Sequence, residues 1–372
     1  MTTTELSQTE GPASGVKRKS RRATLLIDGD VHPSYNVQQM APWLEPDVLA
    51  RVREFGLHAH GVPYPRVRNG AMRLDSRPEE GHELEMVQRQ LLNEYEENIG
   101  ILIPMAGHHW GAERADVAIP LCHAINEFIC KEWLDPEPRF FSTLNVPMEH
   151  PEAAVQEIER YKNDKRFVQI LMSGTAESEI GDKKYWPIYE AAEDAGLALG
   201  VHEGANSRQR MGVGYPSYYL DEHVGMHYTL SSLALSMICE GVFEAFPKLQ
   251  VVSIEASISW AASLQWEMDS AFEMLGRELP HLHAKPSEYF REHFWFTTQP
   301  IEEPDDPNDL VVAYELTGML DRIMFSSDYP HWDFDSPSRA LPATLPTDVR
   351  DAILGGNACR LYGLDPVTAK RR

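Results

Sequence analysis

The motif DGDVHP, residues 28–33, follows an apolar run near the start of the chain and contains two kinds of metal ligand. Side chains alternate between the two faces of a strand, so Asp28, Asp30 and His32 are expected to share one face. Carboxylate oxygen and imidazole nitrogen both bind Zn²⁺ at about 2.0–2.2 Å. A single D-x-H motif is more often a solvated turn, so the metal hypothesis depends on ligands elsewhere in the chain.

Three further apolar runs end in side chains that would complete a metal site. Each candidate also has an ordinary interpretation, as a loop histidine, a turn residue or an exposed charge. Their joint occurrence at strand ends favours one site at which the side chains converge. The candidates are Asp30 and His32 in the first run, His202 in residues 197–204, Ser253 and Glu255 in 249–257, and Ser326 and Asp328 in 322–330.

The rest of the chain alternates between apolar strands and helices. Eight such units predict a (β/α)₈ barrel (TIM barrel), whose buried parallel strands are continuously apolar and carry the chemistry at their carboxyl ends. A doubly wound sheet is the alternative, but no G-x-G-x-x-G follows the first strand. The predicted strands are 25–34, 98–104, 139–147, 166–173, 197–204, 249–257, 293–298 and 322–330, and the predicted helices are 83–97, 115–132, 151–162, 185–194, 229–246, 260–275 and 310–317.

The domain organisation follows from the same pattern. We predict one α/β domain, residues 24–366, followed by a short tail, 367–372. Residues 1–23 are polar and end in the basic run KRKSRR, which predicts a disordered tail. An import or docking signal is the alternative interpretation of that run.

A long segment rich in Pro, Gly and Arg, residues 33–81, separates the first strand from its helix and is predicted to be a substrate loop. It contains a short helix at 46–55 and the triplet His58 to His60, which also has ligand spacing. Arginine is suited to binding a substrate carboxylate. The weaker site candidates are Arg66, Arg68 and Arg73 in this loop, Arg208 and Arg210 after the fifth strand, His223 and His227 before the next helix, and His331 after the eighth strand. Trp260 and Trp266 are predicted to face the core.

Composition narrows the class of protein. A formal net charge of -23 over 372 residues argues against a nucleic-acid surface, which needs clustered Lys and Arg. We expect no membrane span and no signal peptide. The four cysteines are far apart and contain no C-x-x-C, so free thiols in a reducing, cytoplasmic compartment are expected.

Five motifs together resemble the amidohydrolase superfamily: DGDVHP, VHEGA, FEAFPKLQVVSIEASISW, MFSSDYPH and ILGGNACRLYGL. The resemblance covers roughly residues 25–364 and looks closest to the branch that includes the aminocarboxymuconate-semialdehyde decarboxylase-like enzymes. It implies a barrel fold, a small-molecule substrate and a homo-oligomer. It also implies that Asp30, His32, His202 and Asp328 bind one catalytic divalent metal, with Zn²⁺ expected first and Mn²⁺ as an alternative.

Two departures from the superfamily bear on the reaction. The fourth strand offers Gln169, Leu171 and Ser173 in place of the bridging Lys of binuclear members, so one metal is expected. The sixth strand ends in Glu255, where the decarboxylases usually have a His.

We therefore expect first a metal-dependent hydrolase that attacks a C–N or C–O bond of a small anionic or cyclic substrate. In it, Asp328 takes the proton of the water and Glu255 passes it to the leaving group. The alternatives are a non-oxidative decarboxylase of an aromatic or enoic acid, and a binding barrel without turnover.

Overall fold

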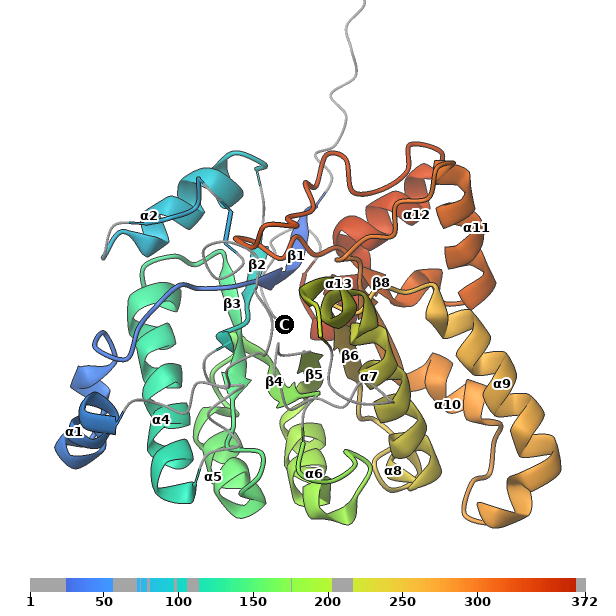
Figure 1. Ribbon diagram of the computed structural model, residues 1–372, viewed down its shortest axis with the longest axis horizontal. Helices are drawn as coiled ribbons and strands as arrows, with labels where there is room; N and C mark the ends of the chain where they lie inside the picture. The colour runs from blue at the N-terminus through green and yellow to red at the C-terminus, as the bar shows by residue number, and fades with distance from the viewer. Residues whose placement is uncertain are drawn as a thin grey trace, which may run out of the picture.

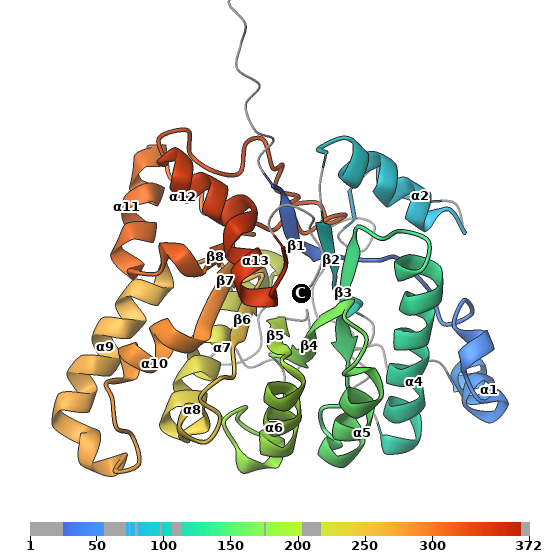
Figure 2. The ribbon, with the colours of Figure 1, turned by 180° about the vertical axis from the view of Figure 1, so that it is seen from behind.

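The computed structural model describes residues 25–55, 72–73, 75–78, 81–96, 99–105, 114–174, 176–202 and 217–365. Their eight strands are parallel and lie side by side in chain order, in the middle of a ring of helices (Figures 1 and 2). The strands are β1 (Ile27–Val31), β2 (Ile99–Leu102), β3 (Phe140–Asn145), β4 (Phe167–Ser173), β5 (Ala198–His202), β6 (Val251–Ile254), β7 (Phe294–Thr297) and β8 (Ile323–Met324).

The sheet closes on itself through the segment that follows β8. The amide of Gly29 donates to the carbonyl of Phe325 at 2.9 Å, and the amide of His32 donates to the carbonyl of Tyr329 at 2.7 Å. Val31 and Tyr329 form an isolated parallel bridge. The predicted single-domain (β/α)₈ barrel is therefore confirmed, although the last strand is much shorter than its apolar pattern suggested.

The helices surround the strands, and α1 lies at the outer edge beside α4 (Figure 1). The helix predicted from residue 229 begins ten residues earlier, at Tyr219, and α10 was not predicted. The helices are α1 (Pro46–Phe55), α2 (Glu83–Val87), α4 (Ala115–Phe128), α5 (Pro151–Tyr161), α6 (Trp186–Ala195), α7 (Tyr219–Cys239), α8 (Val242–Ala245), α9 (Trp260–Leu275), α10 (Pro286–His293), α11 (Pro307–Thr317), α12 (Thr347–Asp351) and α13 (Asn357–Tyr362).

The barrel has apolar packing on both sides of its wall. One cluster fills the layer between the strands and the surrounding helices, and a smaller one fills the inside of the barrel. Inside, Tyr362 donates its hydroxyl to Oε1 of Gln169 at 2.8 Å. Continuous burial of the strand residues leaves only the polar strand ends to form a site.

The two tryptophans predicted to face the core differ. Trp260 packs against Phe290 and Phe296 with ring centroids 6.1 and 5.7 Å away. The prediction for Trp266 is wrong, because its side chain lies on the outer face of α9 and is 56% exposed. None of the four cysteines forms a disulfide. No helix in the described part of the chain is long and apolar enough to cross a membrane.

Candidate metal centre

Three of the expected ligands meet at the carboxyl ends of β1 and β5. Nε2 of His32 is 3.1 Å from Oδ1 of Asp30, and Nε2 of His202 is 3.8 Å from Oδ2 of Asp30. The two imidazole rings are nearly perpendicular, with centroids 5.3 Å apart. One ligand atom from each residue, together with one from Glu255, lies within 4.8 Å of all the others. These separations suit donors that share one cation, because its bonds to nitrogen and oxygen are about 2.0–2.2 Å long.

The local structure orients these donors toward a common point. Nδ1 of His32 donates to the carbonyl of Ile103 at 3.0 Å, and this bond leaves Nε2 unprotonated in the neutral ring. Asp30 is fully buried, yet neither carboxylate oxygen accepts a hydrogen bond from the described residues. A buried carboxylate without hydrogen bonds is costly unless a cation compensates it. The residues present therefore fit a divalent metal.

The fourth expected ligand, Asp328, contacts this group at His32. Its Oδ1 is 2.8 Å from Nε2 of His32 and accepts from Nδ1 of His331 at 2.7 Å. The His331 and His32 rings lie 4.5 Å apart. Asp328 adopts a left-handed backbone conformation, with φ of 58°, that an L residue rarely adopts. The chain thus turns just past β8, and the turn delivers the carboxylate.

Buried Asp28 holds the turn that carries Asp328. Its Oδ1 accepts from the amide of Ser327 at 2.9 Å, and its Oδ2 accepts from the hydroxyl of the same serine. The prediction that Asp28 shares a strand face with Asp30 and His32 is wrong, because the register of β1 shifts between Asp28 and Val31 and interrupts the alternation. The carboxylate of Asp28 positions Ser327 instead.

Glu255 lies one residue past β6 and beside His202. The register pairs His202 with Ile254, so Glu255 comes next to the imidazole. Its amide donates to Oγ1 of Thr297 at 3.1 Å, and its φ is 56°. Its Oε2 is 3.2 Å from Nε2 of His202. As for Asp328, a left-handed residue at a strand end brings a carboxylate to the site.

The electrostatics of the site follow from burial and from crowding of carboxylates. Burial raises the pKa of Asp30 well above its usual value and raises that of Asp28 to about 7. Burial also raises the pKa of Asp328, but His331 and His32 outweigh it and hold that pKa well below its usual value. For His32, burial lowers the pKa, and Asp30 and Asp328 more than offset this. In the metal-free protein the imidazoles thus compensate the buried carboxylates only in part, fully enough for Asp328 but not for Asp30.

Residues 27–364 match the family model described as Amidohydrolase. The chain belongs to the amidohydrolase family. The resemblance drawn from its motifs is thereby confirmed. Curated relatives of this amidohydrolase include two decarboxylases. Gamma-resorcylate decarboxylase of Rhizobium radiobacter is 25% identical over 265 residues, which cover 67% of this chain and 77% of the relative. The 2-amino-3-carboxymuconate-6-semialdehyde decarboxylase of Dictyostelium discoideum is 25% identical over 296 residues, 75% of this chain and 77% of the relative.

Solved structures share the fold of this amidohydrolase. That of 5-carboxyvanillate decarboxylase from Sphingomonas paucimobilis has a TM-score of 0.68 at 22% identity and covers 92% of this chain and 100% of the other. That of a dihydroxybenzoic acid decarboxylase from Polaromonas sp. JS666 has a TM-score of 0.64 at 19% identity and covers 91% and 97%. The second structure contains manganese and the inhibitor 2-nitroresorcinol.

The weaker site candidates differ in their contacts, and several of them lie outside the described residues. The guanidinium of Arg73 pairs with Asp75 at 3.0 Å and lies over the ring of Phe334 at 4.6 Å, so its charge is already partnered. Its amide donates to the carbonyl of Pro330, beside the segment that carries His331. Nδ1 of His227 is bonded to the carbonyl of Val224 in its own helix. Candidates that lie outside the described residues are Arg66, Arg68, Arg208, Arg210 and the triplet 58–60.

Three residues at the barrel mouth were missed from the sequence. Nε2 of Gln299, just after β7, donates to Oδ2 of Asp328 at 3.3 Å and to Oδ2 of Asp333 at 2.8 Å. Asp333 lies 3.4 Å from Nε2 of His223 on α7. Burial and the nearby Asp328 raise the pKa of Asp333 to about 6. Trp332 donates its indole N–H to the hydroxyl of Tyr219 at 3.1 Å. The polar ending of the seventh strand, TTQP, was the available signal for Gln299.

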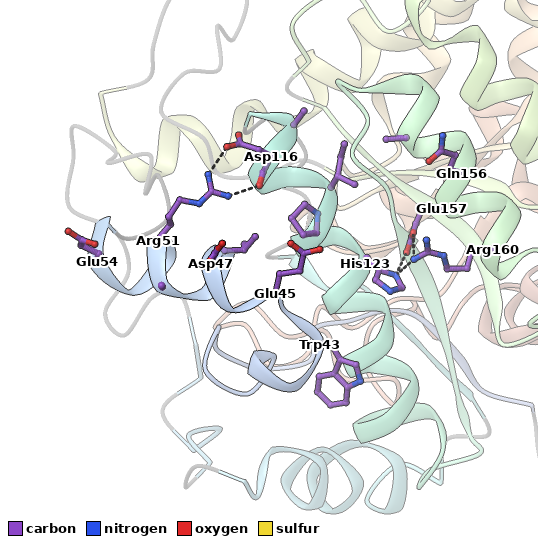
Figure 3. A pocket seen from close by; sticks show the side chains of 16 residues that line it. Trp43, Glu45, Asp47, Arg51, Glu54, Asp116, His123, Gln156, Glu157 and Arg160 are labelled. Atoms are coloured by element: carbon purple, nitrogen blue, oxygen red, sulfur yellow. Dashed lines mark hydrogen bonds and ion pairs between the residues drawn. The ribbon is translucent and has the colours of Figure 1, made fainter.

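A hollow of about 910 Å³ lies elsewhere, on the outside of the barrel between α1, α4 and α5 (Figure 3). Both of its arginines are paired, Arg51 with Asp116 and Arg160 with Glu157 and His123, and its other carboxylates, those of Glu45, Asp47 and Glu54, are exposed. None of the metal-ligand candidates lines it. The chemistry of the side chains therefore places the candidate site of this amidohydrolase at the barrel mouth.

Proposed function

We propose that this member of the amidohydrolase family is a metal-dependent carboxy-lyase. It would remove CO₂ from a small hydroxylated aromatic or enoic acid, and the reaction would need no oxidant. The observation that carries the metal dependence is the fully buried Asp30, whose oxygens accept no hydrogen bond from the described residues and face the imidazoles of His32 and His202. The curated relatives described above, both decarboxylases, support the reaction class.

The proposed ligands are Asp30, His32, His202 and Asp328. A divalent cation held by these residues would neutralise the carboxylate of an anionic substrate and polarise a neighbouring oxygen. Carboxylate and imidazole donors suit both Zn²⁺ and Mn²⁺, and the manganese in the Polaromonas structure supports Mn²⁺.

The chain's own residues account for the proton balance. The C–C bond to the carboxyl group breaks, its electron pair stays on the carbon, and a proton must reach that carbon as CO₂ leaves. Asp328 is the proposed proton carrier: the imidazolium of His331, 2.7 Å from its Oδ1, supplies the proton, Asp328 passes it to the carbon, and solvent reprotonates His331. Gln299 holds the other oxygen, Oδ2. Such fixed geometry places a proton with little reorganisation.

A hydrolase is the second candidate, and Glu255 favours it. A carboxylate 3.2 Å from Nε2 of His202 suits transfer of a proton from a bound water to a leaving group. The substrate-binding candidates Arg66, Arg68, Arg73, Arg208 and His331 stay proposals under both reactions. The unit of residues 24–366, a homo-oligomer and a cytoplasmic location also stay proposals. The cytoplasmic location is supported by the four cysteines, none of which forms a disulfide.

The metal-loaded enzyme distinguishes the two reactions. We expect it to release CO₂ from a panel of hydroxybenzoates and, in D₂O, to place one deuterium on the carbon that lost the carboxyl group. Loss of CO₂ release in Asp328→Asn, with metal retained, would support the proton role. Uptake of solvent ¹⁸O into the product of an ester, lactone or amide, with no CO₂ from any acid, would replace the lyase by the hydrolase.

A further inference from the structure

We propose that the barrel mouth binds a second divalent cation, held by His223, Glu255 and Asp333 beside the centre described above. This inference goes beyond the proposed function, and it removes the argument from Glu255 that favours the hydrolase. It gives Glu255 a ligand role in place of proton transfer, and leaves the proton role of Asp328 unchanged.

The three side chains already have the separations of a ligand set. One ligand atom from each lies within 4.8 Å of the other two, and Nε2 of His223 is 3.4 Å from Oδ2 of Asp333. Two donors on one ion with bonds of about 2.0–2.2 Å are roughly 3–4.4 Å apart. All three residues are half-buried, so water has room to complete the coordination.

Two of the three donors, His223 and Asp333, are held by neighbouring side chains. The ring of His223, near the start of α7, packs against Tyr219 and Trp332 with centroids 5.9 and 5.5 Å away. Oδ2 of Asp333 accepts from Gln299 at 2.8 Å. Donors fixed in this way lose little conformational entropy when an ion binds.

Glu255 connects the two candidate centres. It belongs to the group formed with Asp30, His32 and His202 and also to the group formed with His223 and Asp333. A carboxylate has two oxygens and can bridge two ions, which in two-metal enzymes lie about 3.5–4 Å apart. The second site is therefore adjacent to the first and would share its substrate.

Charge supports a second cation. Asp30, Asp328 and Asp333 each form ion pairs with histidines, and in the described part of the chain no Lys or Arg pairs with them. With Glu255 they place four carboxylates around the mouth. One divalent ion would neutralise two of these four carboxylates, and a second would neutralise the other two.

Metal stoichiometry tests the proposal on the full-length protein. The metal is removed with a chelator, Mn²⁺ is added back, and the bound manganese per chain is measured by plasma mass spectrometry after desalting. Electron paramagnetic resonance reports whether two Mn²⁺ ions are coupled. The variants are His223→Asn and Asp333→Asn for the second site and Asp30→Asn for the first. His227→Asn, one turn further along α7 and bonded to its own helix, is the matched control.

We expect about two Mn²⁺ per chain with a coupled signal in the wild type and in His227→Asn. We expect about one Mn²⁺ per chain and an uncoupled signal in His223→Asn and Asp333→Asn, with circular dichroism unchanged. One Mn²⁺ in the wild type that Asp30→Asn abolishes and His223→Asn retains would overturn the second site and leave the proposed function standing. Two Mn²⁺ that survive both second-site substitutions would place the second ion elsewhere and also overturn it. Retention of all metal in Asp30→Asn would instead contradict the first centre.

Discussion

Charged side chains gather both at the barrel mouth and in the outer hollow between α1, α4 and α5. The two regions differ in how far these side chains are buried and in which groups pair with them. In the hollow, Arg51 lies 2.5 Å from Asp116, and both side chains are more than 40% exposed. At the mouth, Asp30 and Asp328 are fully buried and have imidazoles as partners. Exposed pairs in water contribute little, whereas buried carboxylates are costly unless a cation meets them. Buried charge with incomplete compensation therefore identifies the site better than the volume of a hollow.

Asp30→Asn is expected to give the largest effect. The substitution removes a charged ligand and keeps the shape of the side chain, so metal binding weakens and turnover falls by at least about 10³-fold, which corresponds to several kcal/mol of lost transition-state stabilisation. In the metal-free protein the same substitution removes a buried charge that the imidazoles compensate only in part, and it is expected to raise the unfolding midpoint. Turnover with added metal and calorimetry without it measure the two effects. An active Asp30→Asn enzyme with full metal content would contradict the claim that the buried carboxylate at the barrel mouth binds the metal.

Asp28→Ala is expected to give the next largest effect, on stability and on turnover together. It removes both acceptors of Ser327 and leaves a buried N–H without a partner, at a cost of about 1–3 kcal/mol in the free energy of unfolding. The turn that holds Asp328 also loosens. Asn36→Ala removes a similar side-chain acceptor from an exposed turn and is the control. Urea denaturation should show a clearly smaller loss for Asn36→Ala, and equal losses would contradict the role of Asp28.

His293 provides a buried titratable group outside the mouth. Burial lowers its pKa below 6.5, and its bond to the carbonyl of Leu249 offsets this only in part. Below about pH 6.5 the unfolded chain therefore binds a proton at His293 more readily than the folded protein does. The contribution of the neutral imidazole to the free energy of unfolding is fully present above about pH 7. It is lost as the pH drops below about 6.5, by up to about 1.4 kcal/mol per pH unit.

His293→Gln is expected to reduce this pH dependence, because the amide donates the same bond without titrating. Denaturation of wild type and variant between pH 5.5 and 7.5 measures the difference. Exposed His283, paired with Glu244, supplies the control His283→Gln, which should keep the wild-type slope. A wild-type slope in His293→Gln would show that other groups carry the dependence.

Arg51→Ala is expected to give the smallest effect. The exposed pair with Asp116 is screened by solvent, so the denaturation midpoint and the turnover should both stay within error of the wild type. Measurements in low and high salt test the screening directly. A loss of activity in this variant would give the outer hollow a function that its paired charges do not indicate.

The sequence was sufficient for those parts of the site that depend on strand alternation. Asp30 and His32 leave β1 on one face, and His202 ends β5, as the period of two requires. Asp328 was predicted by extending the same period along residues 322–330, but β8 ends at Met324. Asp328 reaches the site through a left-handed turn instead, as Glu255 does after β6.

The rest of the mouth depends on tertiary contacts that have no local pattern. The pairing of His223 with Asp333 joins α7 to the segment after β8, more than a hundred residues away. The first turns of α7, YLDEHVGMHY, include a glycine and several polar and aromatic residues, so their helix was not predicted and His223 was placed before it. Gln299 has neither a charge nor an imidazole to mark it in the sequence, and only its contacts with Asp328 and Asp333 show its place in the site. Trp266 shows the converse error, since an aromatic residue at helical spacing need not be buried.

The most direct test of the metal centre is an anomalous diffraction measurement at the manganese edge on crystals grown with Mn²⁺. We expect a peak about 2.0–2.3 Å from a carboxylate oxygen of Asp30 and from Nε2 of His32 and of His202. A manganese-loaded crystal with no anomalous peak among these three side chains would contradict the account.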